Sequence, residues 1–306
     1  MEMFGIHNKK NGWAALIAAC LVVAAALPFT GCSNGSDSSG GTFTPVYTKV
    51  AYGTNGAELD MYLKTAQAAA EGIRYIEVTG LTAADVKGTG TWPYAASPLG
   101  KILQNHSPKK VSLKLPETIE GLTNMSCCFY KCANLAGVLK IPAGVTDMTG
   151  CFDSCINLTK APEIPAGVTN MYHCFYGCTG LTQAPVIPNS VTDMSQCFSG
   201  CTGLTQAPEI PAGVTNMFHC FSGCTGLTQA PEIPAGVTEM SECFSGCTSL
   251  TSVTLKCNYV ADKFDSVFED CTALTAGSIK VPQAQLATYQ GKAYKMGTKA
   301  DRFVGF

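Results

Sequence analysis

The chain has 306 residues, of which 14% are charged, and its formal net charge is −2. This balance provides neither the basic field that nucleic-acid binding requires nor a strongly acidic field for cationic partners. The length allows one or two domains, and we predict that any recognition by the chain is local.

The first 31 residues have the pattern of an export signal. Lys9 and Lys10 precede an apolar run that extends from Trp13 to Leu27. The run, of about 15 residues, is short for a helix that must span a bilayer, so cleavage is favoured over an uncleaved membrane helix. Gly31-Cys32 at its end resembles a bacterial lipobox, which implies that Cys32 becomes the lipidated first residue. A plain secretory signal is the alternative.

Residues 32–42 form the next segment, which we assign to the lipidated cysteine and a tether. Ser33 to Gly41 consists almost entirely of Ser, Gly, Asn and Asp. Such a composition cannot bury a core and behaves as a flexible linker. We therefore expect it to hold the folded part away from a membrane.

Residues 43–115 show no regular period and predict an α/β cap at the N-terminal end of the fold. Asn55-Gly-Ala-Glu58 has capping-box spacing and indicates a helix over 57–70. Ser97-Pro98 favours a short helix that runs to Leu103. The β-rich runs 74–79 and 111–115 are expected to be strands, and the second already resembles the strands of the later coils.

A 23-residue repeat dominates the segment 116–275. Residues 201–223 and 224–246 agree at 20 of 23 positions. A unit of this size cannot bury its own apolar residues, so successive coils must stack around one continuous core. The period therefore predicts a β-rich solenoid of 23-residue coils with short parallel strands and short helical turns. Each coil carries Cys-Phe-x-x-Cys, with pairs at 128/132, 151/155, 174/178, 197/201, 220/224 and 243/247.

Two runs in each coil are candidate strands. Val-Thr-x-Met has β-branched residues suited to a parallel ladder, and we expect the most regular strand there. In Ala-Pro-x-Ile-Pro, proline has no backbone N–H, so the same hydrogen-bond donor is missing in each coil and only short bridges are expected. The prolines concerned are Pro162, Pro185, Pro208 and Pro231.

The repeat ends in a C-terminal helical cap, which we assign to 276–306. The period slips by one residue at Phe268 and Cys271. Pro282 then opens a helical pattern, and 302–306 are expected to add a last strand.

The run Val-Thr-x-Met-x-x-Cys-Phe-x-x-Cys-x-x-Leu followed by Ile-Pro resembles the BspA-like leucine-rich repeats of bacterial surface proteins over about residues 111–282. The resemblance implies a right-handed leucine-rich-repeat solenoid on the cell surface, whose relatives act as adhesins for host matrix proteins or other bacteria. It supplies no catalytic residues. Where that family has Ala or Met before the Phe, this chain has Cys, which leaves the cysteine chemistry open.

Three interpretations of the cysteine pairs are possible. The first is a buried ladder of small apolar side chains, because free Cys is among the most buried residue types. Disulfides are the second, since export allows them. Metal binding is the third, although Cys-x3-Cys is a weak zinc pattern. The sequence favours buried thiols, and we assign no metal or cofactor.

Positions that differ between nearly identical coils are expected to be exposed, because a core change would disturb every stacked neighbour. Tyr172-His173 and Phe218-His219 occupy such positions two coils apart. On a solvent face, the two aromatic rings would anchor a protein partner with the histidines as polar companions. Outer packing of the rings over the repeat is the alternative.

Two acidic columns complete the surface pattern. Glu163, Glu209 and Glu232 share one repeat position, which Val186 interrupts, and could meet basic groups on a partner. A solvated face is the alternative. The second column alternates amide and acid, which we interpret as structural, with calcium binding as the alternative: Asn124, Asp147, Asn170, Asp193, Asn216 and Glu239.

The sequence has no nucleophile motif, phosphate loop or His-Glu-x-x-His, so we predict no enzyme. We expect a lipid-anchored protein on the outer surface of a bacterium, acting as an interaction or adhesion module. Its partner would be an extracellular protein or glycan, such as a host matrix protein, bound on one solenoid face. The alternatives are a structural envelope lipoprotein without a host ligand and a thiol- or metal-binding repeat protein. No oligomeric state is indicated.

Overall fold

The computed structural model describes residues 45–306, except Ala70 and Trp92. The predicted signal, the tether and Cys32 lie outside these residues. Within the described part of the chain, no helix is both long enough and apolar enough to cross a membrane.

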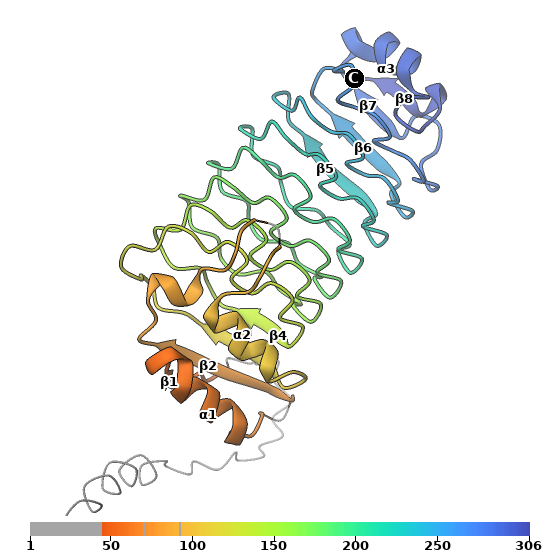
Figure 1. Ribbon diagram of the computed structural model, residues 1–306. Helices are drawn as coiled ribbons and strands as arrows, with labels where there is room; N and C mark the ends of the chain where they lie inside the picture. The colour runs from red at the N-terminus through yellow and green to blue at the C-terminus, as the bar shows by residue number, and fades with distance from the viewer. Residues whose placement is uncertain (1–44, 70, 92) are drawn as a thin grey trace, which may run out of the picture. The chain divides into compact units, whose positions relative to one another are not determined.

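The N-terminal part of the described chain combines a parallel sheet with two helices (Figure 1). The sheet has the order β1-β2-β3-β4, and all three pairings are parallel. Short 3-10 turns lie at Thr54–Gly56 and Ala83–Val86. The elements are β1 Thr48–Ala51, α1 Ala57–Thr65, β2 Ile73–Thr79, α2 Pro98–Asn105, β3 Lys110–Lys114 and β4 Leu135–Val138.

The two helices differ in how well local signals define them. Helix α2 begins as the Ser-Pro pair predicts, because Ser97 Oγ accepts the Gly100 N–H at 3.0 Å. Helix α1 ends at Thr65, before the predicted residue 70, and its N-cap is Gly56 with no side-chain cap bond. The predicted capping box of Asn55 and Glu58 is therefore wrong, because left-handed Gly56, with φ 81°, separates Asn55 from the helix.

The repeated segment stacks successive coils on one another (Figure 1). A ladder of phenylalanine rings fills the core of the stack. Phe198 is fully buried, and its ring stacks on Phe175 at 5.5 Å and on Phe221 at 5.6 Å between centroids. The backbone joins the same coils, since the Phe198 N–H donates to Cys220 O at 2.9 Å. The stacked rings are Phe129, Phe152, Phe175, Phe198, Phe221, Phe244 and Phe268.

The predicted location of the most regular strand is wrong. In each Val-Thr-x-Met run only the third residue pairs across coils, as Asp193 does with Asn170 and Asn216. Two tight turns are the reason: Val191 N–H donates to Pro188 O, and Cys197 N–H donates to Met194 O, each at 3.1 Å. Little extended chain remains between them.

The longer strands instead follow the leucine-to-proline side of the coil. There, β5 spans Gln229–Ile233 and β6 spans Ser252–Leu255. Strand β5 includes Pro231, so the expectation of short bridges fails for this coil but holds at the single pairs Lys160↔Gln183 and Gln206↔Gln229.

The last part of the chain extends this second sheet. Strands β7 Ile279–Val281 and β8 Phe303–Gly305 follow β6 in a parallel order β5-β6-β7-β8. Helix α3 spans Leu286–Lys292, after 3-10 residues Gln283–Gln285, and buries Tyr289. A final 3-10 turn lies at Ala300–Arg302 and leads into the predicted last strand.

Candidate interaction surface

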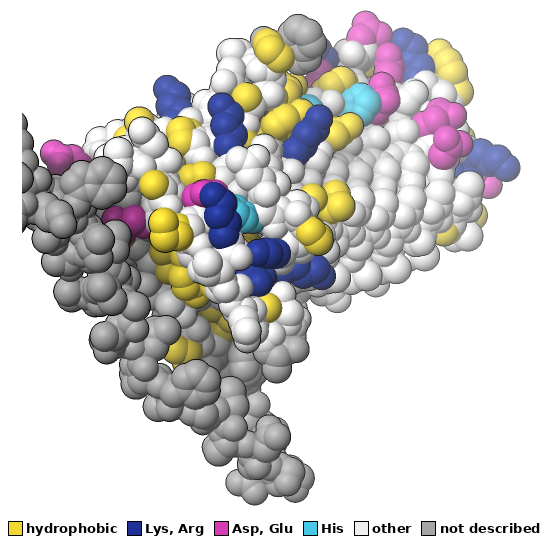
Figure 2. All heavy atoms as spheres, turned by 60° about the horizontal axis from the view of Figure 1, so that its bottom comes forward, with side chains coloured by type: hydrophobic (Ala, Val, Ile, Leu, Met, Phe, Trp, Pro, Cys, Tyr) yellow, Lys and Arg dark blue, Asp and Glu magenta, His cyan; other side chains and the backbone are white. Residues whose placement is uncertain are grey.

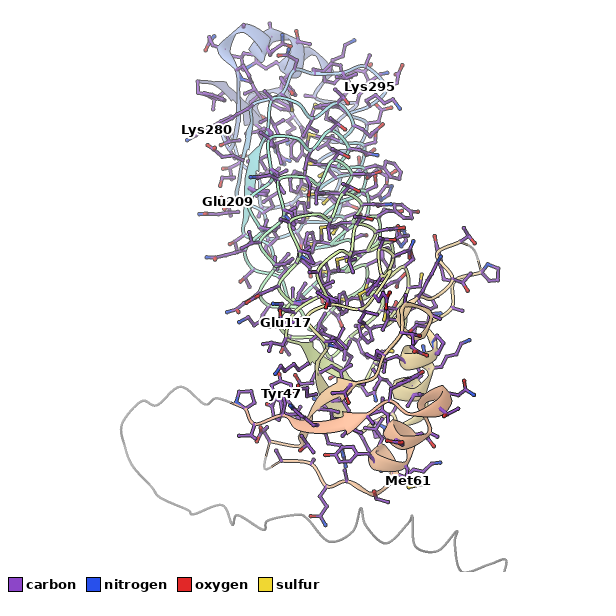
Figure 3. All side chains as sticks on the ribbon, turned by 90° about the vertical axis from the view of Figure 1, so that its left-hand side faces the viewer. Tyr47, Met61, Glu117, Glu209, Lys280 and Lys295 are labelled. Atoms are coloured by element: carbon purple, nitrogen blue, oxygen red, sulfur yellow. The ribbon has the colours of Figure 1, made fainter. Side chains whose placement is uncertain are left out.

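The strands define one face of the domain, which we call the strand face. Single bridges such as Lys140↔Glu163 continue it between the two sheets. Figure 3 shows Tyr47, Glu117, Glu209 and Lys280 along one edge of the domain, with Met61 and Lys295 on the opposite edge. The strand face therefore runs across the coils from one end of the described chain to the other.

The sheet opens in the middle of the strand face. Among the described residues, neither a bridge nor a backbone hydrogen bond joins Val186 to Glu163 or to Glu209. The prolines at 162, 185 and 208 supply no N–H at this rung, as the sequence predicts. The neighbouring main-chain N–H and C=O groups are consequently left for solvent or for a partner.

Four hollows follow the strand face, and adjacent hollows share walls. The first, about 280 Å³, lies between Tyr47, Tyr75 and Leu139. The second, about 640 Å³, shares Lys160 and Glu163 with the first. The third, about 520 Å³, shares Val186 with the second, and the fourth, about 640 Å³, shares Glu209 with the third and extends to Lys256. Together they form a groove along the strand face, which we call the strand-face groove.

The three predicted glutamates all line this groove. Glu163, Glu209 and Glu232 are exposed. Glu232 is paired with Lys256 at 2.6 Å. No ion pair is formed by Glu163 or Glu209 with any described residue, although Lys160 lines the same hollow as Glu163.

Val186 takes the place of a glutamate between Glu163 and Glu209. Its side chain is 88% exposed, an unusual environment for an apolar residue of a stacked fold. It lines both the second and the third hollows. The middle of the groove thus presents an apolar side chain between two carboxylates.

The other predicted site residues lie in the turns around each Cys-Phe-x-x-Cys run, whose surface we call the turn-rich face. Tyr172 and His173 are half-buried, and their rings are 4.5 Å apart. The His173 ring also stacks on Tyr176 at 4.6 Å. Its Nε2 lies 2.6 Å from Gln196 Oε1, and its Nδ1 lies 3.6 Å from Asp153 Oδ2. His173 therefore hydrogen bonds to the following coil, whereas its buried Nδ1 lies near Asp153 of the preceding coil without a hydrogen bond.

Phe218 and His219 repeat part of this arrangement two coils later. Their rings meet edge to face at 4.2 Å, and His219 Nε2 lies 3.2 Å from Glu242 Oε1. Phe218 is half-buried. Among the described residues, no ring contact joins it to Tyr172, so the two pairs are separate features of this face.

Residues that the sequence did not single out extend the aromatic cluster around His173. Tyr94 lies 5.9 Å from Tyr130 and 6.3 Å from His173 between ring centroids. Tyr176 is 37% exposed. Tyr130 and Tyr176 share the position after the Phe, two coils apart, and this signal could have been read from the sequence. Tyr94 belongs to the non-repetitive region, where no pattern indicates its neighbours.

One of the variable positions keeps a constant backbone conformation although its residues differ. The residue before the first Cys of each pair has a left-handed backbone, as in His173 (φ 56°), Gln196 (φ 56°) and His219 (φ 51°). Gly150 occupies the same position with φ 56°. Left-handed geometry is the constant feature of the column, and the side chain is free to vary.

The alternating amide and acid column is structural, as predicted. Each member accepts the N–H of the residue two positions later, as in Asp193 Oδ1 with Ser195 at 2.8 Å. Asp147 also accepts Asn124 Nδ2 at 2.8 Å from the preceding coil. Among the described residues, no group of three or more His, Cys, Asp or Glu side chains is arranged to hold a metal ion.

The cysteines of the described chain are buried free thiols. From the 151/155 pair to the 243/247 pair, the second thiol donates to the Phe carbonyl of the preceding coil, as in Cys201 Sγ to Phe175 O at 3.1 Å, whereas Cys132 Sγ donates to Gly100 O. The Phe175 carbonyl already accepts the Cys178 N–H at 3.1 Å, so the Cys201 thiol occupies its second lone pair. The sequence did not indicate this bond, because it depends on the offset between stacked coils.

Burial makes these thiols poor nucleophiles. It raises the pKa of Cys224 to about 12 and that of Cys201 well above its ordinary value. A thiolate is required for nucleophilic attack or metal ligation. The sulfur ladder is thus an element of the core.

The stacked coils and the open strand face define the class of protein as a leucine-rich-repeat solenoid. The side chains available for binding lie on the surface of its coils. The family model described as "BspA type Leucine rich repeat region" matches residues 104–227 and 172–299, with six copies. The chain therefore belongs to the BspA-type leucine-rich-repeat family. Repeats of this class generally serve as interaction scaffolds, and proteins of the BspA type are typically found on bacterial surfaces.

One solved structure supports the fold, and two others are similar at lower TM-scores. A leucine-rich-repeat protein of T. pallidum is similar at 22% identity and a TM-score of 0.51, over 72% of this chain and 100% of that one. A leucine-rich repeat protein from Bacteroides ovatus is 20% identical, with a TM-score of 0.36 over 63% of this chain and 62% of its own. A leucine rich cell surface protein of Faecalibacterium prausnitzii is 16% identical, with a TM-score of 0.27, over 61% and 83%. No curated protein matches the chain.

Proposed function

We propose that the protein is a non-enzymatic interaction module that binds a protein partner along the strand-face groove. The observation that carries this proposal is the continuity of the groove, whose hollows share Glu163, Val186 and Glu209 as walls. A long, shallow surface of this kind suits a macromolecular partner, because small-molecule sites enclose most of their ligand.

The setting we propose is the outer surface of a bacterium, where Cys32 carries a lipid anchor and the following residues act as a tether. The lipobox-like Gly31-Cys32 and the Ser- and Gly-rich composition support this placement. Adhesion to an extracellular partner, such as a host matrix protein, is consistent with such a display. Protease treatment of intact cells tests it, because a surface domain is digested without lysis whereas one facing the periplasm is protected.

The binding test compares the two faces of the coil. Purified protein is applied to an array of extracellular-matrix proteins and glycans, with a Val186→Arg variant to obstruct the groove and a Tyr172→Ala/Phe218→Ala variant to alter the turn-rich face. Saturable binding that is lost only in Val186→Arg supports the groove. Loss only in the aromatic variant would transfer the function to the aromatic face, and no binding by any form would favour a structural envelope protein.

A further inference from the structure

The middle of the strand-face groove differs from its flanks in charge. At the flanks, each carboxylate has a cation: Glu117 pairs with Lys140, and Glu232 pairs with Lys256. In the middle, Glu209 is the only charged residue in the wall of the third hollow, whose remaining lining is Ala, Pro, Val, Ile and Asn. Glu163 lines the second hollow beside Lys160, and it is also the bridge partner of Lys140 on the preceding coil, whose pKa it helps to raise.

These two carboxylates are regularly spaced along the groove. Glu163 and Glu209 occupy equivalent positions two coils apart, which corresponds to roughly 10 Å at the usual spacing between strands. Figure 3 shows Glu209 extending outward from the edge that carries the strand face. Val186 lies between them and is almost fully exposed.

The chemistry of the walls discriminates between classes of partner. The second, third and fourth hollows contain no aromatic side chain in their lining, so they lack the flat rings on which sugars stack. Free carboxylates repel sulfated or acidic glycans and attract Lys or Arg. The main-chain groups left open at Val186 can form single hydrogen bonds with a peptide that crosses the coils.

We propose that this groove recognises an extended, basic segment of a protein partner. Two cationic side chains contact Glu163 and Glu209, and an apolar side chain between them packs against Val186. A peptide in the polyproline II conformation has three residues per turn and rises about 3.1 Å per residue, so side chains three residues apart share one face and lie roughly 9 Å apart, which matches the spacing of the two carboxylates. This inference rests on the proposed function and specifies the partner for the same groove.

The test uses the full-length chain, purified in micelles of an uncharged detergent, and fluorescein-labelled hexapeptides. The first peptide is Gly-Lys-Ser-Val-Lys-Gly, with lysines three residues apart, and its isomer Gly-Lys-Lys-Ser-Val-Gly has adjacent lysines. A third peptide has glutamate in place of each lysine. Fluorescence anisotropy gives the Kd of each peptide, and circular dichroism checks that every protein variant is folded.

We expect saturable binding of the spaced peptide, weaker binding of the isomer and none of the acidic peptide. Glu209→Gln should weaken binding about two- to five-fold, as expected for one exposed ion pair. Glu163→Gln/Glu209→Gln should weaken it further, and binding should fall as salt is raised. The matched control is Glu269→Gln/Asp270→Asn, which removes two exposed acids from the turn-rich face and should leave the Kd unchanged.

Equal weakening by the control variant, or equal binding of the two isomers, would overturn the proposal because the attraction would then be unspecific. Absence of peptide binding would also overturn it. If the array nevertheless shows a partner whose binding is lost in the Val186→Arg variant, the groove binds another class of ligand. Self-association of the chain through this groove, detected as a dimer that Val186→Arg abolishes, would identify a second copy as the occupant instead.

Discussion

Replacing a central ring of the phenylalanine ladder tests how the coils are held together. Phe198 is fully buried and stacks on two rings, with interplanar angles of 4° and 5°. Truncation of a buried Phe to Ala typically costs about 3–5 kcal/mol. Each ring pair adds about 0.5–1.5 kcal/mol beyond its area, so two pairs account for roughly 1–3 kcal/mol.

We therefore expect Phe198→Ala to lower the free energy of unfolding by about 4 kcal/mol. Phe198→Leu keeps most of the buried apolar area but removes both stacks, and should cost about 2 kcal/mol. Urea unfolding followed by far-UV circular dichroism measures both values, and the slope against urea shows whether the array still unfolds as one unit. Val186→Ala, an exposed change, is the control and should remain within about 0.5 kcal/mol of wild type.

A Leu variant as stable as wild type would show that the rings contribute area alone and that their stacking adds nothing. An Ala variant that loses less than about 1.5 kcal/mol would refute the ladder as a close-packed core, because no cavity of a ring's size would then have formed.

Three further predictions concern other parts of the coil. N-ethylmaleimide at pH 8 should modify none of the buried thiols of the described chain until denaturant is added, as mass spectrometry would show; rapid native labelling would contradict the burial that raises the pKa of Cys224 to about 12. Gly200→Ala should cost about 1 kcal/mol and lower Tm by about 2–4 °C. The cost comes from the left-handed backbone, with φ +73°, and not from a clash, because the new Cβ has no neighbour closer than 3.5 Å. An unchanged Tm would show that the backbone is not strained by a side chain at this position. Burial acts to raise the pKa of Glu239, but hydrogen bonds from Ser241 and Lys263 outweigh this effect and hold the pKa below 4.5. The ionised Glu239 carboxylate therefore stabilises the fold above pH 4.5, and this stabilisation is lost as the pH falls through the lowered pKa. Glu239→Gln should accordingly flatten the decline of Tm between about pH 5 and pH 3, and an identical decline in both proteins would contradict this assignment.

Strong periodicity made much of the core predictable from the sequence. A residue such as Phe198 recurs at one position of every coil, and stacking is the only way for such short units to bury it. The Ser97-Pro98 pair likewise defined the start of α2, because the N-cap bond involves neighbours in the chain. Features set by contacts within one segment or by exact repetition could therefore be predicted from the sequence.

Features that depend on the offset between stacked coils could not be predicted from the sequence. The β-branched Val-Thr run favours a strand by composition, yet the turns closed at Val191 and Cys197 leave little of it extended. The bond from Cys201 Sγ to Phe175 O joins residues 26 positions apart, which no spacing of identical repeats indicates. The missing proline donors were predicted, but the hollows that they open were not, because their depth depends on the side chains of adjacent coils.

The proposed partner binds on the strand face of the coils. The most direct measurement places a photoreactive benzophenone amino acid at Val186 and, in a second protein, at Tyr176 on the turn-rich face, both of which are exposed. Each protein is displayed on intact cells, incubated with extracellular-matrix proteins and irradiated. Binding in the strand-face groove should give covalent adducts from the position of Val186 and none from that of Tyr176. Adducts from the position of Tyr176 alone would contradict it.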